Sequence, residues 1–262
     1  MNAPLMQIHG LTLRRAKRTL CQGLEFDISP GDVLAVLGEN GAGKSTLLLT
    51  LAGLLPADAA AITLRGHRLA GSSRKYIARH LGMLLQEHVD LFPMTVNEAA
   101  LLGRYAHLAP WQPPNAKDLQ RVRRALQQLG LEALAQRDVT TLSGGERRRL
   151  GLATLLVQDP QIYLLDEPSN HLDLRHQIQS LDQLTGQTRE QQRAVVFATH
   201  DLNLAARYSN KTLLLFQDGS HKIGNSQELL VDNELSKLYD FPIHSLRKDG
   251  ITVYYPGLPD EM

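Results

Sequence analysis

The chain has 262 residues, with 28 Lys and Arg against 27 Asp and Glu, so its formal net charge is +1. This balance disfavours a strongly basic nucleic-acid-binding protein, and the single cysteine, Cys21, excludes an intrachain disulfide. The longest apolar stretch, Leu47–Leu55, is interrupted by Thr50 and Gly53, and a membrane-spanning helix needs roughly 20 apolar residues. The length suits one large domain or two small ones.

Short apolar segments predict the strands in chain order. Leu5–Leu13 alternates between polar and apolar residues, which is typical of a half-buried strand. Continuous apolar runs predict fully buried strands at Val33–Leu37, Ile162–Leu165, Val195–Ala198 and Leu213–Phe216. Helical patterns lie between them, at Leu119–Leu129 and Arg147–Val157. This alternation predicts an α/β fold with a mainly parallel sheet.

Residues 87–159 carry helix signals without a convincing buried strand. Within them, Thr95-Val96-Asn97-Glu98 has the pattern of a capping box, in which the hydroxyl and the carboxylate each satisfy a helix-end amide. The polar and proline-rich stretch Pro110–Lys117 then interrupts the helical pattern. We therefore predict that this region is a helical insertion in the α/β core.

A glycine-rich loop follows the first buried run and precedes the helical run Leu47–Leu51. It fits the pattern G-x-x-x-x-G-K-[ST] and consists of Gly38, Glu39, Asn40, Gly41, Ala42, Gly43, Lys44, Ser45 and Thr46. Glycines let successive backbone amides converge on phosphate oxygens, and the positive end of the following helix faces the same anion. Lys44 can reach the β- and γ-phosphates, and the Ser45 hydroxyl can ligate Mg²⁺. The loop predicts nucleotide binding.

The apolar run Ile162–Leu165 ends in two carboxylates, Asp166 and Glu167. At the carboxyl end of a central strand, Asp166 can face the Mg²⁺ ion held by Ser45. Successive strand residues point in opposite directions, so Glu167 need not duplicate that role and is the better candidate for polarising an attacking water. Apolar strands ending in acids are common, so this motif alone is a weak signal. It indicates a Mg²⁺ and catalytic site only because the chain also contains the phosphate loop.

A second glycine-containing segment, Leu142-Ser143-Gly144-Gly145-Glu146, opens the helix predicted to begin near Arg147. Free amides and the helix dipole make such a helix start an anion cradle. One bound nucleotide hardly needs two cradles in one chain, so we predict that this one serves a nucleotide bound to another subunit. The alternative is a helix start that is merely capped.

The order of these motifs resembles that of the ATP-binding cassette ATPases, and the resemblance covers nearly the whole chain. Six motifs follow the family's order: Walker A at Gly38–Thr46, the Q-loop glutamine Gln86, the signature at Leu142–Glu146, Walker B at Ile162–Glu167, the D-loop at Ser169–Asp173 and the switch histidine His200. The resemblance implies a phosphate-loop NTPase (RecA-like) core at about 1–86 and 160–240, including an antiparallel β subdomain. It also implies an α-helical subdomain inserted at about 87–159, and a C-terminal tail at about 241–262.

The resemblance further implies a head-to-tail homodimer. Two ATP molecules would lie between Walker A of one subunit and Ser143, Gly144, Gly145 and Glu146 of the other. Gln86 would contact the Mg²⁺ and its water shell, and His200 would hold the γ-phosphate and the attacking water in register. Lys44, Gln86, Glu167 and His200 then form the expected catalytic set, and Ser45, Gln86 and Asp166 the expected Mg²⁺ set.

The adenine-binding position departs from the family pattern. Many members carry an aromatic residue about where Arg15 lies, and Leu13-Arg14-Arg15-Ala16 contains none. A guanidinium plane can stack on a base, so Arg15 is a candidate substitute. The equal alternative is a solvated basic strand end.

Three segments resemble the ATPases of importers for iron-siderophores, heme and cobalamin: Gly103–Leu108 (G-R-x-P-H, with Ala106 in place of proline), Leu172–Gln177 and His200–Tyr208. This branch implies a peripheral position on the cytoplasmic face of the inner (plasma) membrane. A dimeric permease would place a short helix in the helical subdomain, and a substrate-binding protein outside would complete the system. No nucleic-acid partner is expected. The ATPase never touches the transported molecule, so no residue here identifies it.

Two alternatives stay open. Ser169–Asp173 also resembles the D-loop of translation-associated ABC ATPases, which work without a permease but usually carry two cassettes, whereas this chain has one phosphate loop. A nucleotide-binding regulatory module without turnover is the other alternative, and Gln86, Glu167 and His200 together argue against it. Near the end, Ile251–Tyr255 predicts a terminal strand that favours packing over catalysis.

Overall fold

A six-stranded sheet forms the centre of the fold. The computed structural model describes residues 3–15, 18–57, 59–86, 92–170 and 173–258. In this sheet the strand order is β10-β9-β3-β8-β7-β6, with β10 antiparallel to β9 and all other neighbours parallel. The strands are β3 (Val33–Leu37), β6 (Leu81–Leu84), β7 (Ile162–Asp166), β8 (Ala194–Ala198), β9 (Lys211–Leu215) and β10 (His221–Asn225). The predicted buried strands and the mainly parallel sheet are confirmed.

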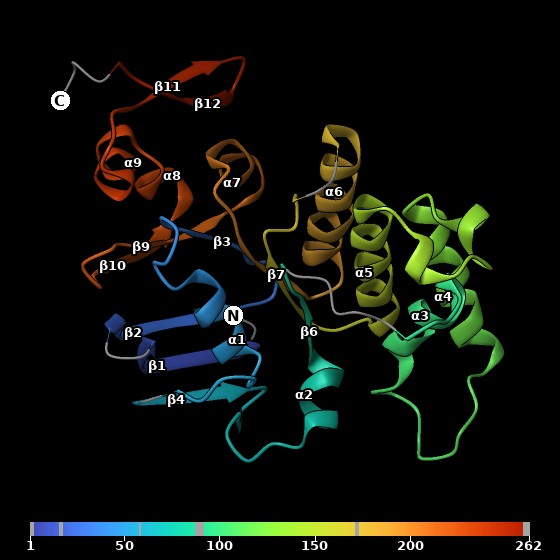
Figure 1. Cartoon of the computed structure of the whole chain (residues 1–262). Helices are drawn as coiled ribbons and strands as arrows, with labels where there is room; N and C mark the ends of the chain where they lie inside the picture. The colour runs from blue at the N-terminus through green and yellow to red at the C-terminus, as the bar shows by residue number, and fades with distance from the viewer. Residues whose placement is uncertain (1–2, 16–17, 58, 87–91, 171–172, 259–262) are drawn as a thin grey trace.

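A second, antiparallel sheet covers one face of the first, as the resemblance implied (Figure 1). Its order is β2-β1-β4-β5, with β1 (Met6–Arg15), β2 (Arg18–Ile28), β4 (Ala59–Leu64) and β5 (His67–Arg68). Helix α1 (Lys44–Leu51) shares a buried apolar cluster with both sheets. The alternation along β3 explains this layering, because Leu34 and Val36 belong to that cluster.

The opposite face of the parallel sheet, including Val33, Ala35 and Leu37 of β3, packs against helices. The regular structure described between residues 92 and 159 is helical apart from one bridge between Thr95 and Asp138. Its elements are α3 (Val96–Leu101), η1 (Leu102–Arg104), α4 (Ala116–Gln128), η2 (Glu132–Leu134), η3 (Val139–Thr141) and α5 (Gly144–Gln158). The predicted capping box at Thr95 and Glu98 is confirmed. The division of the chain into core, insertion and tail stays a prediction.

The remaining helices flank the sheet: α2 (Arg74–His80), α6 (Leu174–Glu190), α7 (Leu202–Tyr208), α8 (Ser226–Leu229) and α9 (Asp232–Tyr239). Within the described part of the chain, no helix is both long and apolar enough to cross a membrane. In Figure 1, α5 and α6 stand beside β7, with α3 and α4 on the far side of α5.

The segment Gly103–Leu108 has a packing role in this structure. A Cβ atom at Gly103 would lie 2.3 Å from the carbonyl oxygen of Thr154, so only glycine lets η1 approach α5 this closely. His107 Nε2 lies 2.7 Å from the Gln158 carbonyl oxygen, and Arg104 forms a 2.8 Å ion pair with Asp118.

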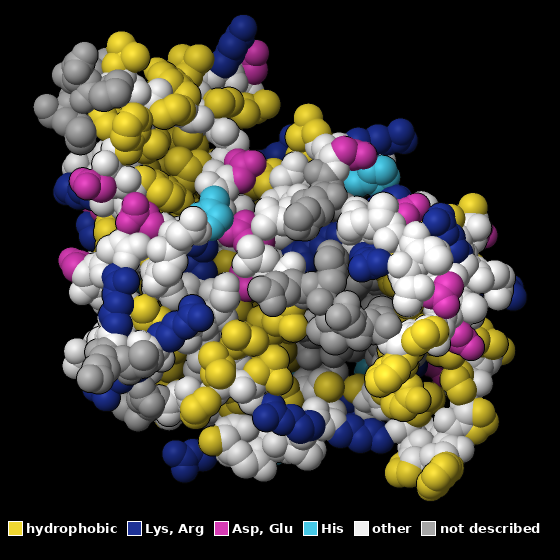
Figure 2. All heavy atoms as spheres, viewed as in Figure 1, with side chains coloured by type: hydrophobic (Ala, Val, Ile, Leu, Met, Phe, Trp, Pro, Cys, Tyr) yellow, Lys and Arg dark blue, Asp and Glu magenta, His cyan; other side chains and the backbone are white. Residues whose placement is uncertain are grey.

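A hairpin of β11 (Ile243–Lys248) and β12 (Ile251–Pro256) ends the described chain, which confirms the predicted terminal strand. Tyr254 is buried, and its hydroxyl donates to the Leu230 carbonyl oxygen at 2.5 Å. Leu246 and Val253 are paired across the hairpin and are exposed. Figure 2 shows hydrophobic side chains gathered over this corner of the molecule. The hairpin therefore packs through one face and leaves the other in solvent.

Candidate functional site

The phosphate loop connects the buried end of β3 to the start of α1. Its glycines Gly38, Gly41 and Gly43 have positive φ angles of 157°, 83° and 107°. A Cβ atom at Gly38 would lie 2.5 Å from the Leu215 carbonyl oxygen of β9, so the loop can pass this strand only with glycine there. Helix α1 begins at Lys44, and its first backbone amides therefore face the loop.

Lys44 folds back across the loop that precedes it. Its ammonium group donates to the carbonyl oxygens of Gly38 at 2.7 Å and Glu39 at 3.1 Å, and the side chain is buried. Burial lowers the pKa of Lys44, while the carboxylates of Glu167 and Asp166 act in the opposite direction. An ammonium group beside converging amides at a helix start is a donor set suited to phosphate oxygens.

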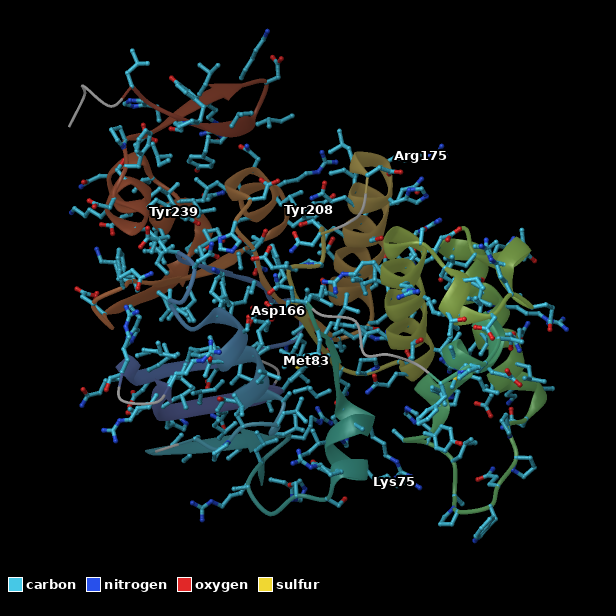
Figure 3. The ribbon with its side chains drawn as sticks, in the orientation of Figure 1. Lys75, Met83, Asp166, Arg175, Tyr208 and Tyr239 are labelled. Atoms are coloured by element: carbon cyan, nitrogen blue, oxygen red, sulfur yellow. The ribbon has the colours of Figure 1, made fainter. Side chains whose placement is uncertain are left out.

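The two carboxylates lie at the end of β7, with Asp166 as the last strand residue (Figure 3). Oδ1 of Asp166 is buried and has no hydrogen-bond partner among the described residues. Glu167 lies outside the strand and has a φ angle of 48°. Strand alternation therefore does not separate Glu167 from the role of Asp166, and the reason predicted from the sequence is wrong. A left-handed backbone conformation sets the direction of Glu167.

His200 and Glu167 are in direct contact. His200 Nε2 lies 3.0 Å from Glu167 Oε1, and the two ring nitrogens lie 3.4 and 3.5 Å from Lys44 Nζ. Burial raises the pKa of Glu167 to about 7, and the nearby Lys44 opposes that rise. Burial, followed by the charge of Lys44, lowers the pKa of His200. The fold thus brings together three members of the expected catalytic set at one edge of the sheet.

The residues around Asp166 fit a Mg²⁺ ion. Magnesium prefers oxygen ligands and usually takes one or two protein side chains together with substrate phosphates and water. The buried, unpartnered Oδ1 of Asp166 is such a ligand, and Ser45 supplies a hydroxyl in the first turn of α1. The described residues contain no group of three or more His, Cys, Asp or Glu that would bind a metal ion unaided.

The signature segment is a capped helix start in this structure. Helix α5 begins at Gly144, three residues before the position expected from the sequence, because Ser143 is its N-cap residue. The Ser143 amide and hydroxyl donate to the Glu146 carboxylate at 2.7 and 2.8 Å. The first-turn amides of Gly144 and Gly145 have no acceptor within a helix and are the groups available to an anion. Direct binding of nucleotide by Glu146 stays a prediction.

Other expected site residues form no hydrogen bond or ion pair with this cluster among the described residues. Gln86 is exposed, two residues beyond the end of β6, and Arg15 is exposed at the end of β1. No hydrogen bond or ion pair of the described residues joins Arg15, Gln86 or Ser143 to Lys44 or Glu167. The expected D-loop, Ser169–Asp173, includes His171 and Leu172, which lie outside the described residues.

Two residues beside the site were missed by the sequence argument. Arg148 of α5 is 1% exposed and donates to the Asp166 and Glu167 carbonyl oxygens at 2.5 and 2.6 Å. Its spacing from the buried residues Leu152 and Leu155 of α5 is helical, and this was the signal available. The hydroxyl of Tyr239, at the end of α9, is buried without a hydrogen-bond partner among the described residues. Burial, and then the charge of Glu167, raises the pKa of Tyr239.

Comparisons with known proteins show which family this chain resembles. A sequence model of the family described as ABC transporter matches residues 21–170. The ferric enterobactin transport ATP-binding protein FepC of Escherichia coli is 35% identical over 229 residues, which cover 87% of this chain and 84% of FepC. The hemin import ATP-binding protein HmuV of Burkholderia ambifaria is 35% identical over 257 residues, 91% of this chain and 94% of HmuV. A chain of a metal-chelate type ABC transporter, solved in an inward-facing conformation, is 30% identical with a TM-score of 0.84, over 99% of this chain and all of that one.

Proposed function

Since this chain belongs to the ABC transporter family, we propose that it hydrolyses ATP to drive uptake of a metal chelate through a partner permease. The contact of His200 with Glu167 beside Lys44 is the structural observation that carries the catalytic part of this proposal. The transported class is taken from the relatives, whose names specify ferric enterobactin and hemin. Ferric siderophore, heme and cobalamin are the candidate substrates.

The phosphate loop binds the triphosphate of ATP in this proposal. Lys44 exchanges the carbonyl oxygens of Gly38 and Glu39 for phosphate oxygens, so its ammonium group changes acceptors without leaving the loop. Its charge and the loop amides then stabilise the negative charge that develops during phosphoryl transfer. Arg15 is proposed to stack on adenine, because it lies at the exposed end of β1.

Glu167 acts as the base or as the group that orients the attacking water. A carboxylate with a pKa of about 7 can accept a proton near neutral pH, which is where a general base is most effective. His200 Nε2 lies 3.0 Å from the Glu167 carboxylate, and its ring nitrogens lie within 3.5 Å of Lys44 Nζ. This arrangement lets His200 position the water and the terminal phosphate with respect to Glu167.

Mg²⁺, when bound, neutralises phosphate charge and polarises the transferring group. Ser45 and Asp166 are the residues proposed to hold it, and Gln86 is proposed to contact its water shell. The unpartnered Oδ1 of Asp166 supports the assignment of that carboxylate.

A homodimer completes the site in this proposal. Gly144 and Gly145 supply amides to the nucleotide held by Lys44 of a second copy, and the dipole of α5, 15 residues long, favours the same anion. The functional complex comprises two copies of the chain, a dimeric permease and an external substrate-binding protein. The chain then lies on the cytoplasmic face of the plasma membrane.

The relatives described above are transport ATPases, which favours the importer over a soluble ABC ATPase without a permease. Purification of the tagged chain from detergent-solubilised membranes distinguishes an importer ATPase from a soluble ABC ATPase. Recovery of a polytopic permease, identified by mass spectrometry, supports the importer. ATP-driven uptake by the reconstituted complex, measured in turn with heme, a ferric siderophore and cobalamin, identifies the substrate. Recovery from the cytosol with ribosomes or repair proteins, and no permease, contradicts the proposal.

A further inference from the structure

The guanidinium group of Arg148 lies at the junction of three segments. It donates to the backbone carbonyl oxygens of Asp166 at 2.5 Å and Glu167 at 2.6 Å, and to that of Leu85. Leu85 directly precedes Gln86, and Arg148 lies on α5, five residues after Ser143. One buried side chain therefore joins the signature helix to the Walker B strand end and to the start of the Q-loop.

This is an unusual way to bury a charge. The side chain is 1% exposed, and burial lowers its pKa to about 10, which still leaves it protonated at neutral pH. Its hydrogen bonds among the described residues go to backbone carbonyls, although the charges of Asp166 and Glu167 are near enough to favour the protonated form. Burying a cation costs several kcal/mol unless hydrogen bonds offset it. The backbone at the site is thus held by a group that tolerates little displacement.

The backbone of Glu167 is the part that needs such support. Its φ angle of 48° lies in the left-handed region, which is uncommon for residues other than glycine and is often found at active sites. Its amide donates to the Ala198 carbonyl oxygen at 3.0 Å, and its own carbonyl accepts from Arg148 and, at 3.1 Å, from the Asn170 amide. Both sides of this residue are therefore fixed, which determines where its carboxylate meets His200.

We propose that Arg148 is a positioning residue that couples the placement of α5, and with it the signature segment, to the backbone of Glu167 and to the segment leading to Gln86. Movement of α5 relative to the sheet then displaces the Glu167 carboxylate directly. This inference rests on the proposed hydrolytic role of Glu167. Arg148 acts through the backbone in this inference, since its hydrogen bonds among the described residues are made to backbone carbonyl oxygens.

Arg193 offers a matched control at the other end of the same two elements. Its guanidinium donates to the Tyr163 hydroxyl near the start of β7 at 2.6 Å and also pairs with Asp159, the C-cap residue of α5. Arg148 and Arg193 thus both join α5 to β7. Arg148 does so beside the carboxylates and Arg193 at the opposite end of the strand. Loss of either side chain removes a partly or fully buried cation.

The test compares Arg148→Met, Arg148→Lys and Arg193→Met in the full chain. We measure kcat, KM, the Kd of a fluorescent ATP analogue and the thermal unfolding midpoint. A displacement of about 1 Å at a reacting group costs about 10²-fold in rate, so we expect Arg148→Met to lower kcat by about that factor with Kd within threefold. Arg148→Lys keeps the charge but loses the planar fork, and we expect a smaller decrease in kcat. Arg193→Met should lower the unfolding midpoint while kcat is retained.

Each outcome decides the inference. A wild-type kcat in both Arg148 variants overturns it, and so does an equal loss of kcat in Arg193→Met. If Arg148→Met does not fold, Arg148→Lys alone provides the test. A lowered kcat at unchanged Kd then supports the inference, and an unchanged kcat overturns it. Wild-type chain that releases no phosphate from ATP with Mg²⁺ overturns the proposed function, and the inference with it. Active wild type with unaffected Arg148 variants overturns the inference alone.

Discussion

His200 Nε2 lies 3.0 Å from Glu167 Oε1, and this contact joins the second residue after β8 to the first residue after β7. Burial shifts the two pKa values in opposite directions, up to about 7 for Glu167 and downward for His200. The carboxylate is therefore the more readily protonated member of the pair. A neutral imidazole beside it can donate a hydrogen bond while Glu167 exchanges a proton near neutral pH.

The raised pKa of Glu167 predicts a pH-dependent stability. Between pH 4.5 and about 7 the unfolded chain loses this proton while the folded chain keeps it, so the free energy of unfolding falls as the pH rises. The full effect, at most about 3 kcal/mol, is reached above pH 7. Glu167→Gln stays neutral and lacks the effect. Urea denaturation should show wild type losing stability relative to Glu167→Gln across this range.

His200 acts in the opposite direction, because its lowered pKa makes stability rise with pH below 6.5. Both proteins retain His200, so their difference reports mainly on Glu167. A difference that is constant from pH 4.5 to 8 would show that the Glu167 pKa is not raised.

The capping boxes that begin α5 and α3 separate helix stability from a role in the dimer. Ser143 and Thr95 accept from the amides of Glu146 and Glu98 at 3.3 and 3.2 Å, so Ser143→Ala and Thr95→Ala should each cost about 0.5–2 kcal/mol of stability. Only Ser143→Ala should also lower ATP turnover and ATP-dependent dimer formation. Ser143→Arg should abolish hydrolysis and leave ATP binding by the isolated subunit largely intact.

Phosphate release measures ATP turnover, calorimetry measures ATP binding, and light scattering measures dimer formation. Equal loss of monomer ATP affinity in Ser143→Arg and Lys44→Ala contradicts the assignment of Ser143 to a second copy's nucleotide. Equal effects of Ser143→Ala and Thr95→Ala on turnover would show that Ser143 only caps α5 and has no role in the dimer.

Gln86 should matter for coupling more than for ATP binding. It is exposed just beyond β6 and precedes the helical elements that begin with α3 in the sequence. Gln86→Ala should reduce permease-stimulated turnover in proteoliposomes, with a weaker effect on the Kd for ATP. Gln22→Ala, which removes an exposed glutamine on β2, is the matched control. Unchanged stimulation in Gln86→Ala contradicts this role.

The strands and loops that the sequence predicted well are those whose signal is local. Continuous apolar runs were sufficient for β3, β7 and β8, and the glycine pattern was sufficient for the phosphate loop. Strand β6 was missed because its four residues include Gly82, where a Cβ atom would lie 2.4 Å from the Leu155 side chain. That glycine is required by packing against α5, which no local pattern shows.

The site was predicted in its residue types and only partly in its geometry. Arg148 lies within the run Arg147–Arg149, and its helical spacing from Leu152 and Leu155 was the one sequence signal that set it apart from its neighbours. Its burial depends on the carbonyl groups of three segments that meet only in the folded chain. The direction of Glu167 likewise depends on a left-handed backbone held by tertiary hydrogen bonds.

The most direct test is phosphate release by Glu167→Gln, measured beside size-exclusion chromatography with ATP and Mg²⁺. This substitution preserves size and hydrogen bonding but removes the basic carboxylate. Turnover should therefore fall by about 10²–10⁴-fold while ATP binding survives. Unhydrolysed ATP should hold two copies together, so the variant should elute as a dimer, whereas Glu234→Gln, which breaks a surface ion pair with Lys222, should behave as wild type. Near-normal phosphate release by Glu167→Gln, or a monomer with ATP bound, would contradict the account.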